Sequence, residues 1–159
     1  MLTPEQINNL PPDTKKEYLQ TVLLLDQKKK DQSVRDDFMS FVKYIWPEFI
    51  EGEHHKIMAD KFNRVASGDI KRLIINMAPR HTKSEFASYL LPAWMIGNNP
   101  KLKIIQATHN AELAVRFGRK AKTVIDSEEY QRIFNTRLRE DSKAAGKWET
   151  DQGGEYYAA

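Results

Sequence analysis

A Lys-Ser pair at the start of a predicted helix is the feature of this sequence with the clearest chemical use. The apolar run Leu73-Ile74-Ile75 precedes a short polar turn, and Lys83-Ser84 follows that turn. The first N–H groups of a helix have no partner within the helix, and the helix dipole favours negative charge there. Such a turn can therefore bind phosphate oxygens. Lys83 would neutralise the β- and γ-phosphates of a nucleotide, and the Ser84 hydroxyl would coordinate Mg²⁺.

The turn lacks both glycines of the phosphate-binding loop pattern G-x-x-x-x-G-K-S/T. Met77 occupies the first glycine position and Thr82 the second. A Cβ atom at position 82 narrows the accessible range of φ, and with it the ability of the loop to wrap around a phosphate. From the pattern alone, an ordinary strand-to-helix turn is an alternative to a nucleotide-binding loop.

The segment from Asn76 to Glu85 nevertheless resembles the Walker A segment of terminase large subunits, the DNA-packaging ATPases of tailed bacteriophages. That family commonly has Pro-Pro-Arg-His-Gly-Lys-Ser at this place, so Thr82 is the main departure from its pattern. The resemblance covers about residues 36–159. Further similar segments follow in the family's order: Leu91–Trp94, Ile104–His109, Ala111–Ala114, Tyr130–Phe134 and Lys147–Thr150.

The resemblance implies a truncated α/β P-loop NTPase of the RecA/ASCE-like type, a parallel sheet flanked by helices with an N-terminal helical extension. Residues 1–35 would be the extension or linker, and residues 36–159 the N-terminal portion of the ATPase domain. In the family, a strand ending in paired acids (Walker B and the catalytic glutamate) and a nuclease domain follow. No run of four apolar residues ending in Asp-Asp or Asp-Glu follows Ser84. We therefore expect the amino-terminal part of a terminase, from a truncated, split or intron-interrupted gene, with negligible ATPase activity on its own.

The resemblance also assigns a site for the cofactors ATP and Mg²⁺. Lys83 and Arg80 are the predicted catalytic residues, because a guanidinium three residues before the lysine can make bidentate contacts to the γ-phosphate or to an adjacent subunit. Ser84 is the predicted metal ligand. His55, with its neighbour His54, resembles the family position near the adenine. The predicted nucleotide-binding residues are Ala78, Pro79, Arg80, His81, Thr82, Lys83, Ser84, Glu85 and His55. A solvated helix start and surface positions for Arg80 and the histidines are the alternatives.

The function implied by the resemblance is translocation of double-stranded DNA into a procapsid, driven by ATP hydrolysis. The implied partners are double-stranded DNA, the portal protein, the small terminase subunit and further copies in a homo-oligomeric ring, in the host cell cytoplasm on the procapsid. Two alternatives stay open. A helicase-like P-loop ATPase of another family would differ in the sequence downstream of residue 159. A non-catalytic nucleotide-binding or assembly fragment would be excluded by steady ATP turnover.

Composition sets few further limits. The chain has 159 residues, 40% of them hydrophobic and 30% charged, which is enough for one modest core. It contains no cysteine, which excludes disulfides and thiolate metal sites, and its four histidines do not have zinc-site spacing. No apolar run approaches the roughly 20 residues of a membrane span, so no membrane partner is expected. The net charge of +3 permits contact with nucleic acid without arguing for it.

Hydrophobic spacing and capping residues predict the elements that position the site. A charged run at 28–32 is predicted to separate the first two helices, with Ser33 capping the second. Pro92 is predicted to end or kink the helix that follows the loop. The basic residues of the last helix are expected on a solvated face rather than against DNA. The predicted helices cover 13–30, 33–46, 53–67, 83–91 and 110–125, the strands 72–77 and 102–107, and a hairpin 147–157.

Overall fold

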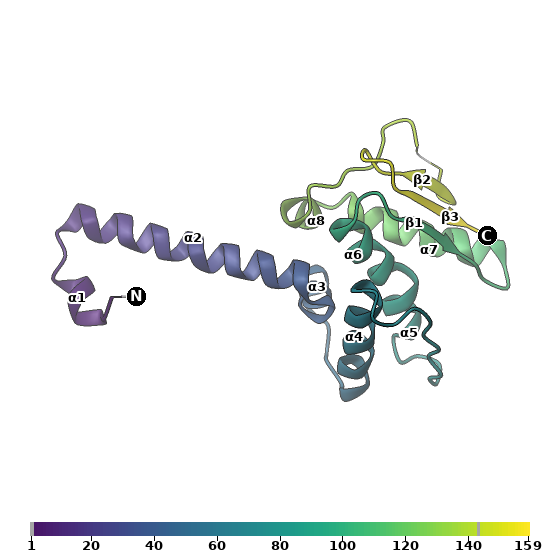
Figure 1. The fold of residues 1–159 in the computed structure, drawn as a ribbon, viewed down its shortest axis with the longest axis horizontal. Coiled ribbons are helices and arrows are strands. Elements are labelled where there is room, and N and C mark those ends of the chain that lie inside the picture. Colours follow the sequence, from purple (N-terminus) through teal and green to yellow (C-terminus); the bar gives the residue numbers. More distant parts are fainter. Residues whose placement is uncertain (1, 143) are drawn as a thin grey trace. The chain divides into compact units, whose positions relative to one another are not determined.

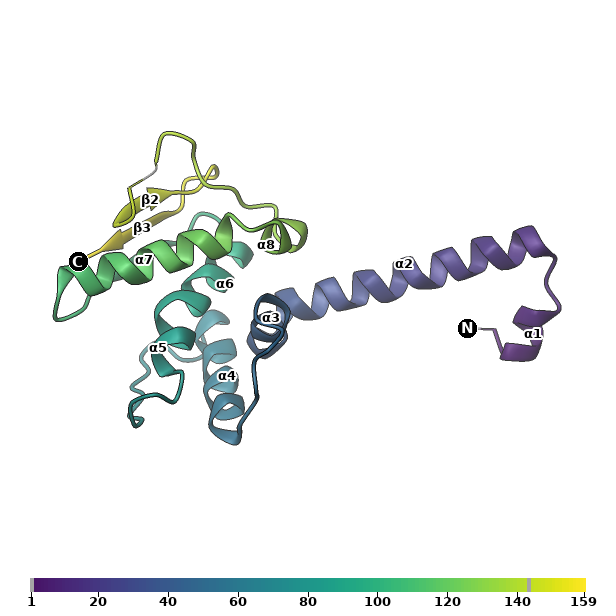
Figure 2. The ribbon, with the colours of Figure 1, turned by 180° about the vertical axis from the view of Figure 1, so that it is seen from behind.

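The computed structural model of this chain describes residues 2–142 and 144–159. The chain divides into two compact units, Met1–Ser33 and Val34–Ala159. The first unit holds helix α1 (Pro4–Asn8) and most of helix α2 (Pro12–Asp36). Figures 1 and 2 show the ribbon from opposite sides. The second unit contains the predicted nucleotide loop, and it is described by itself below.

Helix α2 runs without interruption through residues 28–32, so the predicted break at this charged run is wrong. Charged side chains one helical turn apart stabilise the helix there. Lys30 Nζ lies 2.8 Å from the Asp26 carboxylate, and Gln27 Nε2 donates to Asp31 Oδ1 at 2.6 Å. The next helix is capped by Asp37 rather than Ser33, and the Asp37 carboxylate accepts from the Ser40 N–H at 2.7 Å.

The second unit is an α/β fold with a small mixed sheet. Strand β3 pairs with β1 in parallel and with β2 antiparallel, giving the order β1-β3-β2. The predicted strand 102–107 and the predicted hairpin are thereby confirmed, and helix α7 lies along one face of the sheet (Figures 1 and 2). The elements are α3 (Phe38–Ile45), α4 (Glu53–Ala66), α5 (Lys83–Glu85), the π-helical turn η1 (Phe86–Leu90), α6 (Leu91–Asn98), β1 (Lys103–Gln106), α7 (Ala111–Ile125), α8 (Glu128–Ile133), β2 (Lys147–Glu149) and β3 (Glu155–Ala158).

Residues 72–77 do not form the predicted strand. The exposure of this segment alternates as in a strand, with Leu73, Ile75 and Met77 half-buried against the core and Ile74 86% exposed. However, its backbone makes no ladder hydrogen bond with any part of the chain that the structure describes. The apolar run predicted a strand here, but a strand also requires a neighbour for its N–H and C=O groups.

An aromatic core holds the helix that carries the Lys-Ser pair. The ring of Phe38 meets the rings of Phe62, Phe86 and Trp94 edge-on, at centroid distances of 5.2, 5.5 and 5.6 Å. Because these four residues come from α3, α4, η1 and α6, the contacts fix the start of the loop helix against both preceding helices. Helical spacing predicts that Ile57, Met58, Phe62 and Val65 of α4 face the core. The prediction is correct for Met58 and Phe62, which are buried, and wrong for Ile57, which is 58% exposed.

The loop helix continues past its predicted end, from Lys83 through α5, η1 and α6 to Asn98. Pro92 is the second residue of α6 and does not end the helix. In a regular α-helix its ring would press on the carbonyl of Ser88 and its nitrogen would leave a hydrogen bond unmade. The wider π turn, closed by a hydrogen bond from Leu91 N to the Phe86 carbonyl, accommodates both defects.

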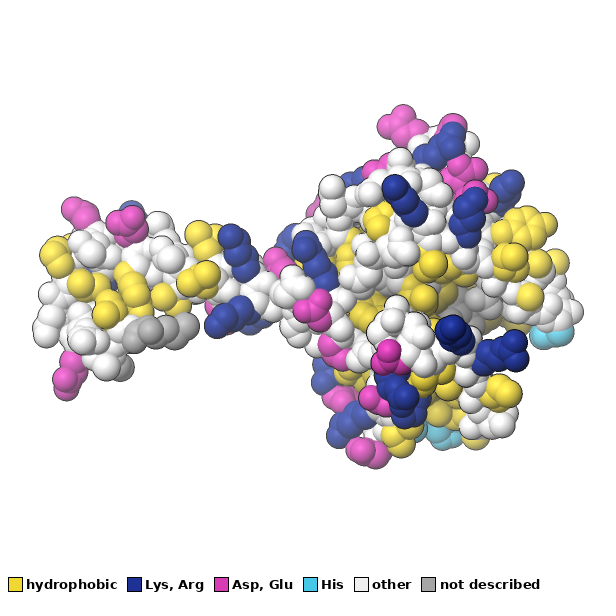
Figure 3. Space-filling model, viewed as in Figure 1, with side chains coloured by type: hydrophobic (Ala, Val, Ile, Leu, Met, Phe, Trp, Pro, Cys, Tyr) yellow, Lys and Arg dark blue, Asp and Glu magenta, His cyan; other side chains and the backbone are white. Residues whose placement is uncertain are grey.

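Basic and acidic side chains both occur across the face of the second unit drawn in Figure 3. On α7, Arg116 and Arg119 are exposed, and Lys120 Nζ lies 5.0 Å from the centroid of the Tyr89 ring. Both arginines therefore point to solvent, as predicted for this helix. Among the described residues, none of the helices combines the length and the apolar character needed to cross a membrane.

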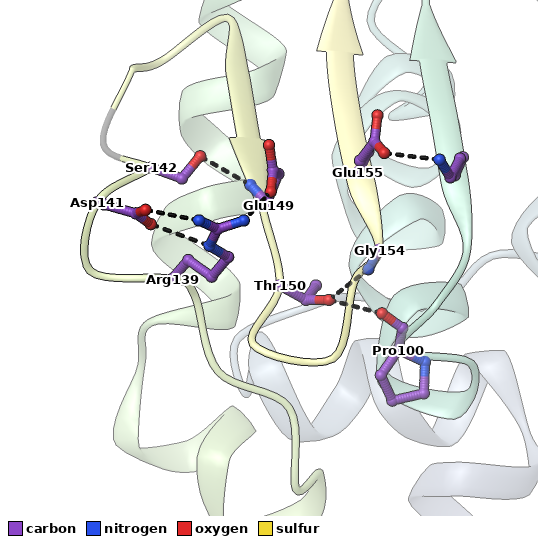
Figure 4. A network of polar contacts seen from close by, with 9 residues as sticks. Pro100, Arg139, Asp141, Ser142, Glu149, Thr150, Gly154 and Glu155 are labelled. Atoms are coloured by element: carbon purple, nitrogen blue, oxygen red, sulfur yellow. Dashed lines mark hydrogen bonds and ion pairs between the residues drawn. The ribbon is translucent and has the colours of Figure 1, made fainter.

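The hairpin is tied to the turn before β1 by one threonine (Figure 4). Thr150 Oγ1 donates to the Pro100 carbonyl at 2.6 Å and accepts from Gly154 N at 2.8 Å. A Cβ atom at Gly154 would lie 2.3 Å from the Pro100 carbonyl oxygen, so the two chain segments are in close backbone contact. The rings of Trp148 and Tyr156 stack face to face with their centroids 4.7 Å apart, and both side chains are fully buried. They therefore pack within the hairpin, as its sequence predicts, and are not exposed for stacking on bases.

Candidate functional site

The predicted loop forms a hollow on the surface of the second unit. The hollow has a volume of about 290 Å³ and is formed by the loop and the first residues of the loop helix, which are half-buried. The structure thus brings the predicted loop residues together, and it places His55 of α4 against them. The residues that line the hollow are Ala78, Pro79, Arg80, His81, Thr82, Lys83, Ser84 and Glu85.

Two loop residues have the left-handed backbone conformation that usually belongs to glycine. Arg80 has φ 64° and Thr82 has φ 55° with ψ 8°. This region costs an ordinary L-residue about 1–2 kcal/mol, and a β-branched residue such as threonine is rare in it. Thr82 therefore takes up the conformation for which the loop pattern uses its second glycine. Thr82 adopts φ > 0 despite its Cβ atom, and how tightly the loop can wrap around a phosphate stays a prediction.

The helix start behind Thr82 offers unpaired N–H groups. The Thr82 carbonyl accepts the first helical hydrogen bond, from Phe86 N at 3.0 Å, and no side chain caps the helix. The N–H groups of Lys83, Ser84 and Glu85 have no hydrogen-bond acceptor among the residues that the structure describes. Because these groups converge at the positive end of the helix dipole, they can bind the oxygens of an anion.

Lys83 and Ser84 are the first two residues of the loop helix and line the hollow. Lys83 Nζ donates to the Met77 carbonyl at 3.1 Å, so the ammonium group bridges the two ends of the loop. The Ser84 hydroxyl has no partner among the described residues. Those residues also contain no cluster of three or more His, Asp or Glu side chains suited to a metal ion. A Mg²⁺ ion at Ser84 would therefore need phosphate oxygens as further ligands, which is the usual arrangement for this ion.

The remaining loop side chains face solvent. Arg80 is exposed and forms no ion pair within the described part of the chain, so its guanidinium is free to contact a ligand or a neighbouring subunit. His81 Nδ1 donates to the Pro79 carbonyl at 2.9 Å, since a carbonyl oxygen can only accept. This bond closes the turn in front of Thr82 and gives His81 a structural contact within the loop.

His55 joins helix α4 to the loop through a chain of hydrogen bonds. Gly52 N donates to His55 Nδ1 at 2.9 Å, His55 Nε2 lies 2.5 Å from Thr82 Oγ1, and Thr82 Oγ1 donates to the His81 carbonyl at 2.7 Å. His55 is only 6% exposed, and both ring nitrogens are engaged within the protein. The contact near an adenine predicted for this residue stays a prediction. Its contact with Thr82 was missed, because no local pattern links residues 27 positions apart.

The surroundings of His55 favour the neutral imidazole. Burial lowers the pKa of His55 below the ordinary value of 6.5, and the nearby His54 and His81 lower it further. The Glu51 carboxylate acts in the opposite direction with a smaller effect than burial. The rings of His54 and His55 lie 3.8 Å apart, so a positive charge on either disfavours one on the other.

A second, largely apolar hollow of about 480 Å³ adjoins the loop on the side of Lys83 and Ser84. Its walls come from α4, the extended segment and the loop helix, and they include Phe62, Leu73 and Ile75. A third hollow of about 430 Å³ at the start of α7 is lined by His109, Arg116 and Arg119, among others. It is separate from the loop residues and shares no lining residue with them.

Comparison with known proteins adds no relative from which a role can be transferred. The chain matches no protein-family model, no curated protein and no solved structure. What supports a function is therefore the geometry of residues 78–85 together with the resemblance of their sequence to a Walker A segment.

Proposed function

We propose that this chain is the ATP-binding part of a viral DNA-packaging motor, a terminase large subunit, and that residues 78–85 bind the triphosphate. The observation that carries the proposal is the left-handed Thr82 directly before three unpaired helix N–H groups, together with the Lys83 ammonium, which contacts the Met77 carbonyl at the other end of the loop. A phosphate-binding loop needs this combination of backbone donors, dipole and ammonium group. The sequence resemblance adds the class of motor.

Each loop residue has a separate role in the proposal. Lys83 exchanges its bond to the Met77 carbonyl for charge-assisted bonds to the β- and γ-phosphates, which are stronger. Ser84 gives one oxygen to Mg²⁺, and the nucleotide gives others. Arg80 approaches the γ-phosphate from the open side of the loop or reaches a neighbouring subunit. Positioning and charge neutralisation of this kind carry most of the catalysis of phosphoryl transfer.

In the complete motor, hydrolysis of ATP is coupled to translocation of double-stranded DNA into the procapsid. The partners in the proposal are the portal protein, the small terminase subunit and further copies in a ring on the portal, in the host cell cytoplasm. A motor that moves any sequence should contact DNA phosphates rather than bases. These partners enter the proposal through the sequence resemblance.

Nucleotide binding by the 159-residue chain tests the proposal. Calorimetric titration with ADP and Mg²⁺ should show one site, and Lys83→Ala should weaken it by about ten- to hundredfold, as expected for a lost charge-assisted contact of about 1.5–3 kcal/mol. Lys101→Ala, which removes an exposed lysine outside the loop, is the matched control and should leave the affinity unchanged. Circular dichroism confirms folding. Equal ADP affinity for the folded Lys83→Ala chain and the parent would refute the phosphate-loop assignment.

A further inference from the structure

We infer that His55 is a positioning residue for the phosphate-binding loop. Its Nε2–H group holds Thr82 in the left-handed conformation and draws the Thr82 hydroxyl away from the helix start. In this chain, a histidine–threonine pair thereby supplies what a glycine supplies in the loop pattern. The inference rests on the proposed function only in that phosphate is the ligand of the loop.

The helix cap of α4 fixes which ring nitrogen of His55 carries the proton. Gly52 N is a backbone donor, and it lies 2.9 Å from His55 Nδ1. Nδ1 must therefore present its lone pair, and in the neutral ring the hydrogen is on Nε2. That hydrogen is directed at Thr82 Oγ1, at an N···O distance of 2.5 Å.

The Thr82 hydroxyl is consequently engaged in both directions. It accepts from His55 Nε2 and donates to the His81 carbonyl at 2.7 Å. A threonine immediately before a helix normally turns its hydroxyl onto the N–H groups of the first turn. Thr82 does not cap its helix, and the N–H groups of Ser84 and Glu85 stay available to a ligand. Without His55, the hydroxyl would be free to rotate and cap them itself.

Aromatic packing holds the His55 ring in place. The ring lies between Phe49 and Phe86, with centroid distances of 4.8 and 5.1 Å. Phe86 belongs to the same helix as Lys83, and its ring is fully buried in the aromatic core. His55 is therefore fixed relative to the loop helix, so its bond to Thr82 can impose a backbone conformation rather than follow one.

The charge state of the cluster determines whether the contact exists. A proton on Nδ1 would face the Gly52 N–H and remove the acceptor that orients the ring. The titratable groups facing His55 are Glu51 in the segment before α4, His54 on α4 and His81 in the loop. The aromatic neighbours carry no charge. Protonation of His55 should thus break the chain of hydrogen bonds and release Thr82.

A double-mutant cycle separates positioning from a general structural effect. His55→Ala should weaken ADP binding about tenfold in the parent chain and less than about twofold in a Thr82→Gly background, because glycine adopts φ > 0 without support. His55→Gln keeps a donor on the side chain and should recover most of the affinity. His109→Ala removes an exposed imidazole outside the loop and is the matched control. Equal weakening by His55→Ala in both backgrounds would overturn the inference.

A measurement of the Thr82 backbone conformation in the absence of nucleotide tests the role of His55 independently of the proposed function. Backbone chemical shifts and scalar couplings of residue 82 report the sign of φ, and they should show loss of the left-handed conformation in His55→Ala but not in His109→Ala. If the parent chain fails to bind ADP, the nucleotide assignment falls while this measurement still decides the role of His55. An unchanged conformation at Thr82 in the folded His55→Ala chain would overturn the inference whatever the ligand.

Discussion

Arg80 and Lys83 lie three residues apart in the loop, but their surroundings predict different contributions to nucleotide binding. The Lys83 ammonium donates to the Met77 carbonyl at 3.1 Å and is thereby held across the loop, on the residue whose own N–H would hold the β-phosphate. Arg80 is exposed and has no ion-pair partner in the described part of the chain. Lys83→Ala should therefore weaken ADP and ATP binding alike, whereas Arg80→Ala should weaken only the binding of ligands with a γ-phosphate.

The two effects should also differ in size. Loss of the partly shielded Lys83 contact should cost about 1.5–3 kcal/mol, which is about ten- to hundredfold in affinity for both nucleotides. The Arg80 contact is open to solvent, where screening reduces charge interactions to about 0–1 kcal/mol. We expect a decrease of up to about fivefold for a non-hydrolysable ATP analogue and none for ADP. The ratio of the two affinities is thus the diagnostic quantity.

The assay is a set of isotherms for ADP and the ATP analogue on the parent chain and on both variants. Because Arg80 has φ 64°, Arg80→Gly provides a further comparison, in which the guanidinium is lost and the left-handed backbone is relaxed. The two position-80 variants should agree if the side-chain charge is responsible. Equal loss of ADP and ATP-analogue affinity in Arg80→Ala would refute the assignment of Arg80 to the γ-phosphate.

Three further predictions concern stability. The pKa of His55 lies below 6.5 in the folded chain, so the unfolded chain binds a proton more readily. The melting temperature should therefore fall as the pH is lowered through 6.5 and should level off above it. A parallel pH series on His55→Ala should show a weaker dependence of the melting temperature on pH. Phe38→Ala should cost about 3–5 kcal/mol in urea unfolding, since the ring is fully buried. Gly154→Ala should lower the melting temperature more than Gly153→Ala. A Cβ atom at position 154 would lie 2.3 Å from the Pro100 carbonyl oxygen, whereas Gly153, with φ 92°, has open space around it. A larger decrease for Gly153→Ala would count against the hairpin contact.

The sequence allowed the loop and its helix to be predicted because their signals are local. Lys83-Ser84 after a turn, and the apolar residues of the segment 102–107, are recognisable within about ten residues. The mistakes came from longer range. Whether residues 72–77 form a strand depends on a neighbouring strand, and the pattern of the segment itself carries no information about that neighbour. The charged run 28–32 predicted a linker, whereas its side chains form an ion pair and a hydrogen bond one helical turn apart that continue α2.

The residues of the candidate site could be predicted from the sequence, but the hydrogen bonds between them could not. The residues of the loop follow from one contiguous motif. The left-handed conformation of Thr82 depends on His55, which is distant in sequence and for which the sequence predicted only a position near the adenine. The bond from Gly52 N to His55 Nδ1 is local to the start of α4, whereas the bond between His55 Nε2 and Thr82 Oγ1 depends on tertiary packing. Tertiary contacts of this kind are invisible to propensity and spacing.

The two chain segments that flank the loop are held to different extents, because the backbone of residues 72–77 forms no ladder hydrogen bonds with the described part of the chain. On one side, the loop helix is held by the aromatic core; on the other, the chain reaches the loop through a segment whose amides are not paired in the described structure. An unpaired extended segment with Ile74 exposed has N–H and C=O groups that a strand of a second copy could pair with. Such pairing would restrict the loop, and self-association would then be thermodynamically linked to anion affinity. In that case the apparent dissociation constant for nucleotide would depend on protein concentration.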